Sequence, residues 1–128
     1  MKKLCFAFVL IVLLAACNQS TPSSLLAPLA YAELMQQESG VLLDVRTVEE
    51  FNEAHLEGAI QLDYYETESF SAALDQMDKS KTYYIYCRSG SRSSNAQSMM
   101  AEKGFKKVYN LDGGILAWRK AQLPVVTP

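Results

Sequence analysis

Residues 81–104 read KTYYIYCRSGSRSSNAQSMMAEKG, and they decide the fold. The β-rich run 81–86 predicts a strand, and residues 93–103 predict a helix that stops at Gly104. Cys87 therefore stands where a strand ends and a loop begins, and this loop leads into a helix. In open α/β sheets, ligands bind beyond the carboxyl ends of the strands. The sequence thus places a cysteine where a functional site is expected.

Outside this stretch, helical and strand-like segments continue to alternate. The expected helices cover residues 28–39, 47–54, 67–78 and 115–122, and the expected strands cover 41–45, 59–62 and 106–110. Thr47 and Glu50 have the spacing of a capping box at the start of one helix. Because such alternation requires crossover connections, we predict an α/β fold with a mainly parallel sheet and helices on both faces.

The candidate chemistry lies in one loop, Cys87-Arg88-Ser89-Gly90-Ser91-Arg92-Ser93. Successive backbone N–H groups can curl around the sulfur while the helix N-terminus points at it, and both effects favour negative charge. Gly90 permits a backbone angle that side chains resist, and Arg88 and Arg92 add positive charge that favours a thiolate. A structural cysteine would instead have apolar surroundings. We therefore interpret Cys87 as an activated nucleophile.

The chain also resembles the single-domain rhodanese family over nearly all of residues 28–128. The landmarks that carry the resemblance are LDVR at 43–46, Glu50-Phe51, HLEGAI at 55–60, the Cys87 loop and GGILAW at 113–118. The resemblance implies a rhodanese-like three-layer fold with a five-stranded sheet and a catalytic cysteine at Cys87. It further implies that the substrate is bound by the loop, which comprises Arg88, Ser89, Gly90, Ser91, Arg92 and Ser93.

The resemblance implies a sulfurtransferase that needs no cofactor. Such an enzyme takes a sulfane sulfur from thiosulfate or a related anionic donor, holds it as a Cys87 persulfide, and passes it to a thiophilic acceptor such as cyanide or a thiol. The alternative is a non-catalytic, membrane-tethered rhodanese module for binding or sensing, which the intact Cys87, Gly90 and Arg92 disfavour. Phosphatase relatives of this fold have a loop one residue longer between cysteine and arginine, which disfavours phosphatase or arsenate reductase activity.

Four further side chains invite a functional interpretation, and for each we favour a structural one. His55 is the only histidine and would have to be the base of a catalytic triad, but the loop already supplies charge stabilisation. Asp44 and Arg46 flank the end of a strand and suit an ion pair or turn clamp, while Trp118 suits core packing. With one histidine and no cysteine cluster, no metal site is expected.

The N-terminus has the pattern of an export signal. Lys2 and Lys3 precede an apolar run over residues 4–16, which is shorter than the roughly 20 residues that a spanning helix needs. Leu14-Ala15-Ala16-Cys17 resembles the lipobox of bacterial lipoproteins, which implies a signal peptide at 1–16 and acyl chains such as palmitate on Cys17. We expect the polar residues 17–27 to form a flexible tether and residues 28–128 to form the rhodanese domain.

The expected mature chain is therefore exported and anchored to a lipid membrane, facing the periplasm. Asn18 after the acylated cysteine favours the outer membrane in a Gram-negative cell. Of the 12 Lys and Arg residues, Lys2 and Lys3 leave with the signal, so 10 face 14 Asp and Glu, a net charge of −4. This balance, without a basic run, gives no support for nucleic-acid binding. Once Cys5 is removed and Cys17 acylated, Cys87 is the only free thiol.

Overall fold

The structure, a computed structural model, describes residues 24–128. In this part of the chain, five parallel strands form one sheet in the order β1-β5-β4-β2-β3. The strands are β1 (Leu25–Leu26), β2 (Val41–Asp44), β3 (Ile60–Gln61), β4 (Thr82–Tyr86) and β5 (Lys107–Leu111). The predicted parallel α/β sheet is confirmed, and β4, which leads into the Cys87 loop, lies at its centre.

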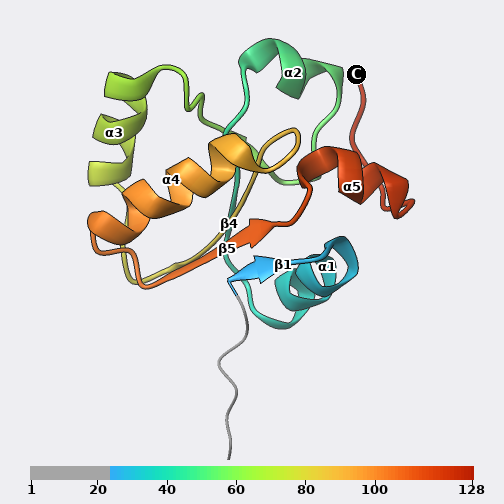
Figure 1. Cartoon of the computed structure of the whole chain (residues 1–128), viewed down its shortest axis with the longest axis horizontal. Coiled ribbons are helices and arrows are strands. Elements are labelled where there is room, and N and C mark those ends of the chain that lie inside the picture. Colours follow the sequence, from blue (N-terminus) through green and yellow to red (C-terminus); the bar gives the residue numbers. More distant parts are fainter. Residues whose placement is uncertain (1–23) are drawn as a thin grey trace, which may run out of the picture.

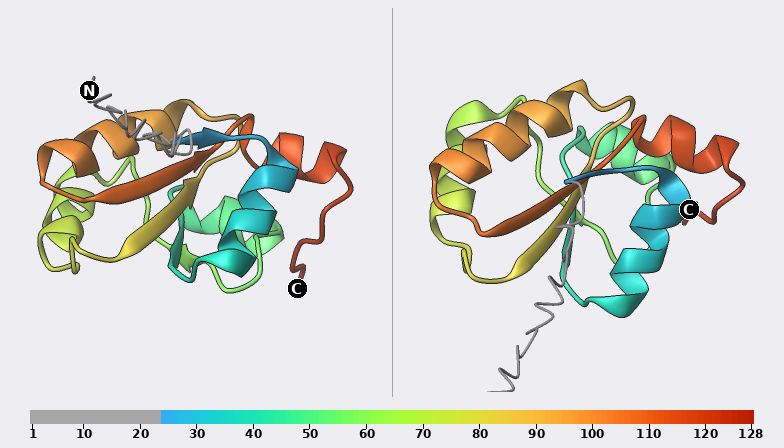
Figure 2. Two further views of the ribbon diagram at one scale, coloured as in Figure 1. Left: turned by 90° about the horizontal axis from the view of Figure 1, so that it is seen from below. Right: turned by 60° about the horizontal axis from the view of Figure 1, so that its bottom comes forward.

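Helices cover both faces of this sheet (Figures 1 and 2). The helices are α1 (Pro28–Gln37), α2 (Val48–Glu53), α3 (Thr67–Asp75), α4 (Ser91–Glu102) and α5 (Gly114–Lys120). Helices α3 and α4 pack on one face, and α1 and α5 pack on the other. Helix α2 follows the carboxyl end of β2 and therefore lies at the edge of the sheet where Cys87 emerges. The predicted three-layer arrangement is confirmed.

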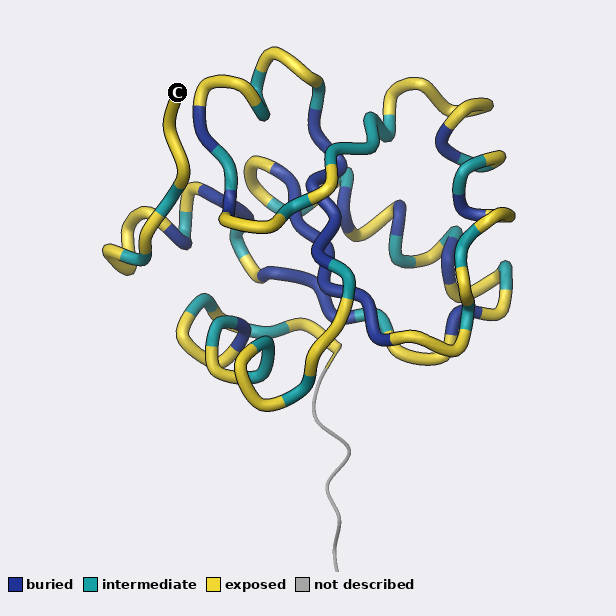
Figure 3. The backbone as a smooth tube through the Cα atoms, turned by 180° about the vertical axis from the view of Figure 1, so that it is seen from behind, coloured by how far each residue is buried: buried dark blue, intermediate teal, exposed yellow. Residues whose placement is uncertain are grey.

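All five residues of β4 are buried, because the strand is covered on both sides. Tyr83 and Ile85 join the core beneath α3 and α4, whereas Tyr84 and Tyr86 join the core beneath α1 and α5. Figure 3 shows the buried backbone gathered in the middle of the molecule, with the exposed segments outside it. The two cores hold the end of β4, and hence Cys87, in a fixed position.

One boundary needs correction. The tether was expected to extend over residues 17–27, but Leu25 and Leu26 form β1 and pair with Asn110 and Leu111 of β5. A two-residue strand leaves no periodic signal in the sequence, and its place is set by the open edge of β5, whose backbone groups need partners. Residues 1–23, which include the expected signal peptide, Cys17 and most of the tether, lie outside the described residues.

The helix bounds differ from the expected ones by a few residues. Helix α4 begins at Ser91 instead of residue 93, because Gly90 has φ 118° and forms the N-cap. Helices α3 and α5 end earlier than expected, at Asp75 and Lys120. The capping box is confirmed, since the Glu50 N–H donates to the Thr47 hydroxyl at 3.3 Å and the Thr47 N–H donates to the Glu50 carboxylate at 3.1 Å. Between residues 24 and 128, no helix has the length and apolarity to cross a bilayer.

Candidate active site

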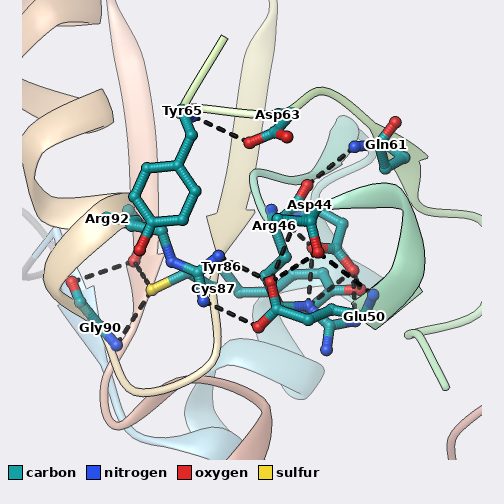
Figure 4. A network of polar contacts seen from close by, with 12 residues as sticks. Asp44, Arg46, Glu50, Gln61, Asp63, Tyr65, Tyr86, Cys87, Gly90 and Arg92 are labelled. Carbon is teal, nitrogen blue, oxygen red and sulfur yellow. Dashed lines mark hydrogen bonds and ion pairs between the residues drawn. The ribbon is translucent and has the colours of Figure 1, made fainter. Parts of the chain in front are cut away.

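The Cys87 sulfur lies in a small cradle of hydrogen-bond donors at the end of β4 (Figure 4). The Gly90 N–H donates to Sγ at 3.1 Å, and the Ser93 Oγ lies 3.3 Å from Sγ. In the same geometry the Ser93 hydroxyl lies 3.1 Å from the Gly90 carbonyl oxygen, to which it can also donate. Since the residue is only 1% exposed, these groups replace water as the partners of the sulfur.

This environment favours the thiolate form of Cys87. Burial alone would raise the pKa of the thiol, but hydrogen bonds from the Ser93 hydroxyl and from the backbone N–H groups of Ser93, Gly90 and Ser89 outweigh it, so the pKa lies below its ordinary value. The start of α4 is aimed at the same atom, and its unpaired N–H groups favour an anion there. The thiolate is therefore stabilised mainly by the loop backbone and one hydroxyl.

The loop is held from behind by the start of α5. The Ile115 N–H donates to the Cys87 carbonyl oxygen at 2.9 Å, and the Leu116 N–H donates to the Arg88 carbonyl oxygen at 3.2 Å. Gly114 has φ 60°, and a Cβ there would overlap the Cys87 and Arg88 carbonyl groups. The close approach of α5 to the Cys87 loop is the reason that a glycine stands at position 114.

Arg92 does not extend freely into solvent. Its two terminal nitrogens bind the Glu50 carboxylate at 2.7 and 2.9 Å, and its guanidinium carbon lies 5.0 Å from the centre of the Tyr65 ring. Figure 4 shows the side chain running past Cys87 toward Glu50. The Arg92 guanidinium lowers the pKa of Glu50 to about 2, so the pair stays ionised at neutral pH. The sequence predicts a substrate-binding role for Arg92, but no pattern in the sequence relates Arg92 to Glu50.

Arg88 turns to a different place. It lines a cavity of about 120 Å³ between α2 and α5, together with Arg46, Glu50, Glu53 and Arg119 among others, and neither Cys87 nor Arg92 is part of that lining. Of the loop serines, Ser89 and Ser91 are exposed, whereas Ser93 is fully buried against the sulfur. The substrate-binding roles expected for these residues stay predictions.

A buried network of hydrogen bonds connects the chain segments next to the site. Arg46 Nε and Nη2 donate to the Asp44 carboxylate at 2.9 and 2.7 Å, and the Tyr86 hydroxyl donates to the same carboxylate at 2.6 Å. Arg46 Nη2 also donates to the Ala54 carbonyl oxygen at 2.7 Å, just beyond α2. The network joins the ends of β2 and β4 to the end of α2. The expected ion pair of Asp44 and Arg46 is confirmed, and Tyr86 is a partner that the sequence did not reveal.

His55 has a structural place, as favoured from the sequence. Its Nδ1 donates to the Phe51 carbonyl oxygen at 2.9 Å, and its ring stacks on that of Phe51 with the centroids 3.8 Å apart. Its backbone forms an antiparallel bridge with Val126. Trp118 is 5% exposed and packs in the core. Within residues 24–128, no cluster of three or more His, Cys, Asp or Glu side chains is arranged to hold a metal ion.

Comparison with known proteins gives matches over most of the chain. A family model for the rhodanese-like domain matches residues 27–121. The chain is 35% identical over 95 residues to a protein of Allochromatium vinosum named sulfurtransferase, covering 74% of this chain and 86% of that one. It is 32% identical over 93 residues to the thiosulfate sulfurtransferase GlpE of Glaesserella parasuis, covering 73% and 83%. The solved rhodanese-like domain of Alr3790 from Anabaena sp. has a TM-score of 0.70 at 24% identity, covering 84% of this chain and 81% of that chain.

Proposed function

This chain belongs to the rhodanese-like domain family, and on that premise we propose that it is a sulfurtransferase that carries the transferred sulfur as a persulfide on Cys87. The single observation that carries the proposal is the cradle around Sγ, in which Gly90 and Ser93 place donors at 3.1 and 3.3 Å. An anionic sulfur is stabilised there without water. The names of the relatives from Allochromatium vinosum and Glaesserella parasuis support the same reaction class.

The proposed cycle has two displacement steps. The Cys87 thiolate attacks the sulfane sulfur of thiosulfate, the new S–S bond forms, the S–S bond of the donor breaks, and sulfite leaves with the electron pair. Cyanide or a thiolate then attacks the terminal sulfur, and Cys87 leaves as the thiolate. The cycle consumes no cofactor. Charge on the terminal sulfur develops near the loop N–H groups and the start of α4, where fixed dipoles stabilise it. The proposed substrate-binding residues are those of the loop after Cys87, namely Arg88, Ser89, Gly90, Ser91, Arg92 and Ser93.

The proposal is tested by mass spectrometry of the purified protein. Incubation with thiosulfate should add the mass of one sulfur atom, located at Cys87 by peptide mapping. Addition of cyanide should then restore the original mass and release thiocyanate. Failure to gain sulfur from thiosulfate, a thiosulfonate and a low-molecular-weight persulfide would contradict the proposal and favour a binding or sensing module.

We further propose that Cys17 is acylated and anchors the exported domain to a membrane, facing the periplasm and in the outer membrane of a Gram-negative cell. The motif Leu14-Ala15-Ala16-Cys17 supports this, because small residues before the cysteine suit cleavage by a lipoprotein signal peptidase. Several acyl chains on one residue give firm membrane attachment, at about 0.8 kcal/mol for each buried methylene.

Cys17→Ser should remove the lipid and leave unprocessed precursor. Cells grown with labelled fatty acid should show label in the wild-type protein and none in the variant. Cys5→Ser is the matched control, because Cys5 lies within the expected signal and its loss should leave the labelling intact. Label that still enters the Cys17→Ser protein would overturn the assignment.

A further inference from the structure

The Glu50–Arg92 pair joins α2 to the start of α4 beside the catalytic sulfur. The contact is bidentate, with N–O distances of 2.7 and 2.9 Å, and the arginine side chain is 12% exposed. Tyr65 lies over the guanidinium on another side. A planar guanidinium held by two parallel hydrogen bonds has little freedom to turn toward a ligand. Glu50 therefore fixes where the Arg92 charge lies and offsets most of it.

The pair stands close enough to Cys87 for its charges to matter. The Arg92 side chain passes beside Cys87 on its way to Glu50 (Figure 4). The thiolate accordingly adds to the rise in the pKa of Arg92, although the effect of Glu50 is larger. Arg88 lines the cavity between α2 and α5, which Glu50 also lines, and Cys87 is not part of that lining. With Glu50 in place, an incoming anion meets a guanidinium and a carboxylate together, not an unpaired cation.

We infer that Glu50 sets the preference of this site for the charge of the sulfur donor, by pairing with Arg92 beside Cys87. This inference rests on the proposed sulfurtransferase function. A donor with one negative charge is favoured, because a dianion suffers twice the repulsion from the Glu50 carboxylate, and the Arg92 guanidinium is already paired with that carboxylate. Glu50 thereby acts in two ways. It positions the Arg92 guanidinium, and its own negative charge repels the donor, so that it determines specificity for donor charge.

Two donors that differ in charge and little in size provide the test. Thiosulfate is a dianion, and methanethiosulfonate replaces one anionic oxygen with a methyl group and carries one charge. The measured quantity is the ratio of kcat/KM for thiosulfate to kcat/KM for methanethiosulfonate. Loss of one nearby charge should change this ratio about fivefold at the short distances and partial solvation of such a site.

Glu50→Gln should raise the ratio about fivefold, and Arg92→Ala should lower it by a similar factor. The opposite directions are the decisive feature, because both variants break the same ion pair. If the pair served only to hold α2 against α4, both variants would shift the ratio in the same direction or leave it unchanged, and either result would overturn the inference. Glu49→Gln is the matched control, since it removes the same charge from an exposed neighbour on α2 without touching Arg92.

A second readout is independent of any donor. The pH dependence of Cys87 alkylation by iodoacetamide reports the pKa of the thiol, which should be lower in Glu50→Gln than in wild type and higher in Arg92→Ala. Unchanged thiol pKa values in both variants would contradict the inference even if turnover were affected. If the wild-type protein accepted sulfur from neither donor, the inference would fail, and failure with a low-molecular-weight persulfide as well would remove the proposed function. Turnover with an unchanged charge preference in Glu50→Gln would remove only the role of Glu50.

Discussion

Cys87→Ser should abolish sulfur transfer and leave the fold intact. Cys87 is 1% exposed and its sulfur lies in a cradle made by Gly90 and Ser93, so an oxygen atom fits the same space and can use the same donors. A serine hydroxyl cannot hold a stable persulfide, so the first displacement has no product. The assay is thiocyanate formation from thiosulfate and cyanide, together with the intact mass after treatment with thiosulfate. Thermal unfolding should show that the variant is still folded.

Arg92→Ala is the informative contrast, because it should weaken turnover without removing it. The backbone N–H of Gly90 and the hydroxyl of Ser93 remain, and the charge of Arg92 is already offset by Glu50. The loss should therefore be smaller than the roughly hundredfold or greater loss seen when a preorganised donor to a developing anion is deleted.

Turnover of Cys87→Ser at the wild-type rate would show that the nucleophile has been assigned to the wrong residue.

Asp44→Ala should lower the free energy of unfolding by about 3–5 kcal/mol, the usual loss when one partner of a buried ion pair is removed. Asp44 is 0% exposed and Arg46 is 5% exposed, so the guanidinium would be left buried without its counter-charge. The Tyr86 hydroxyl would lose its acceptor at the same time. Because domains of this size are stable by about 5–15 kcal/mol in total, the variant should be close to unfolding at body temperature.

Urea titration measures the free energy of unfolding of Asp44→Ala, and Asp75→Ala provides the matched control. Asp75 pairs with Lys103 at 2.7 Å, a distance equal to that of the Arg46–Asp44 pair, but its side chain is 52% exposed. Exposed pairs contribute about 0–1 kcal/mol, so this variant should unfold near the wild-type midpoint. Similar losses in the two variants would mean that the Asp44 network does not stabilise the junction of β2, β4 and α2.

Local patterns in the sequence determined the class of fold and the place of Cys87. The strand 81–86, the following loop and the helix after it are encoded by neighbouring residues, because β-branched and aromatic residues favour a strand and Gly104 favours the end of a helix. The Thr47 and Glu50 capping box is likewise a local device, and its two members are three positions apart. These features could be predicted and were confirmed. Cys87 at the carboxyl edge of the sheet followed from them.

Tertiary structure alone decided which partners surround Cys87. Arg92 and Glu50 are 42 positions apart, as are Tyr86 and Asp44, so no periodic pattern relates them. They meet because β2 and β4 are adjacent parallel strands, whose carboxyl ends bring α2 and the Cys87 loop to one edge. The same order of strands in the sheet places α5 against the Cys87 loop at Gly114. A sequence reveals contacts between near neighbours, whereas contacts across a sheet depend on the order of its strands, and that order arises only when the whole chain packs.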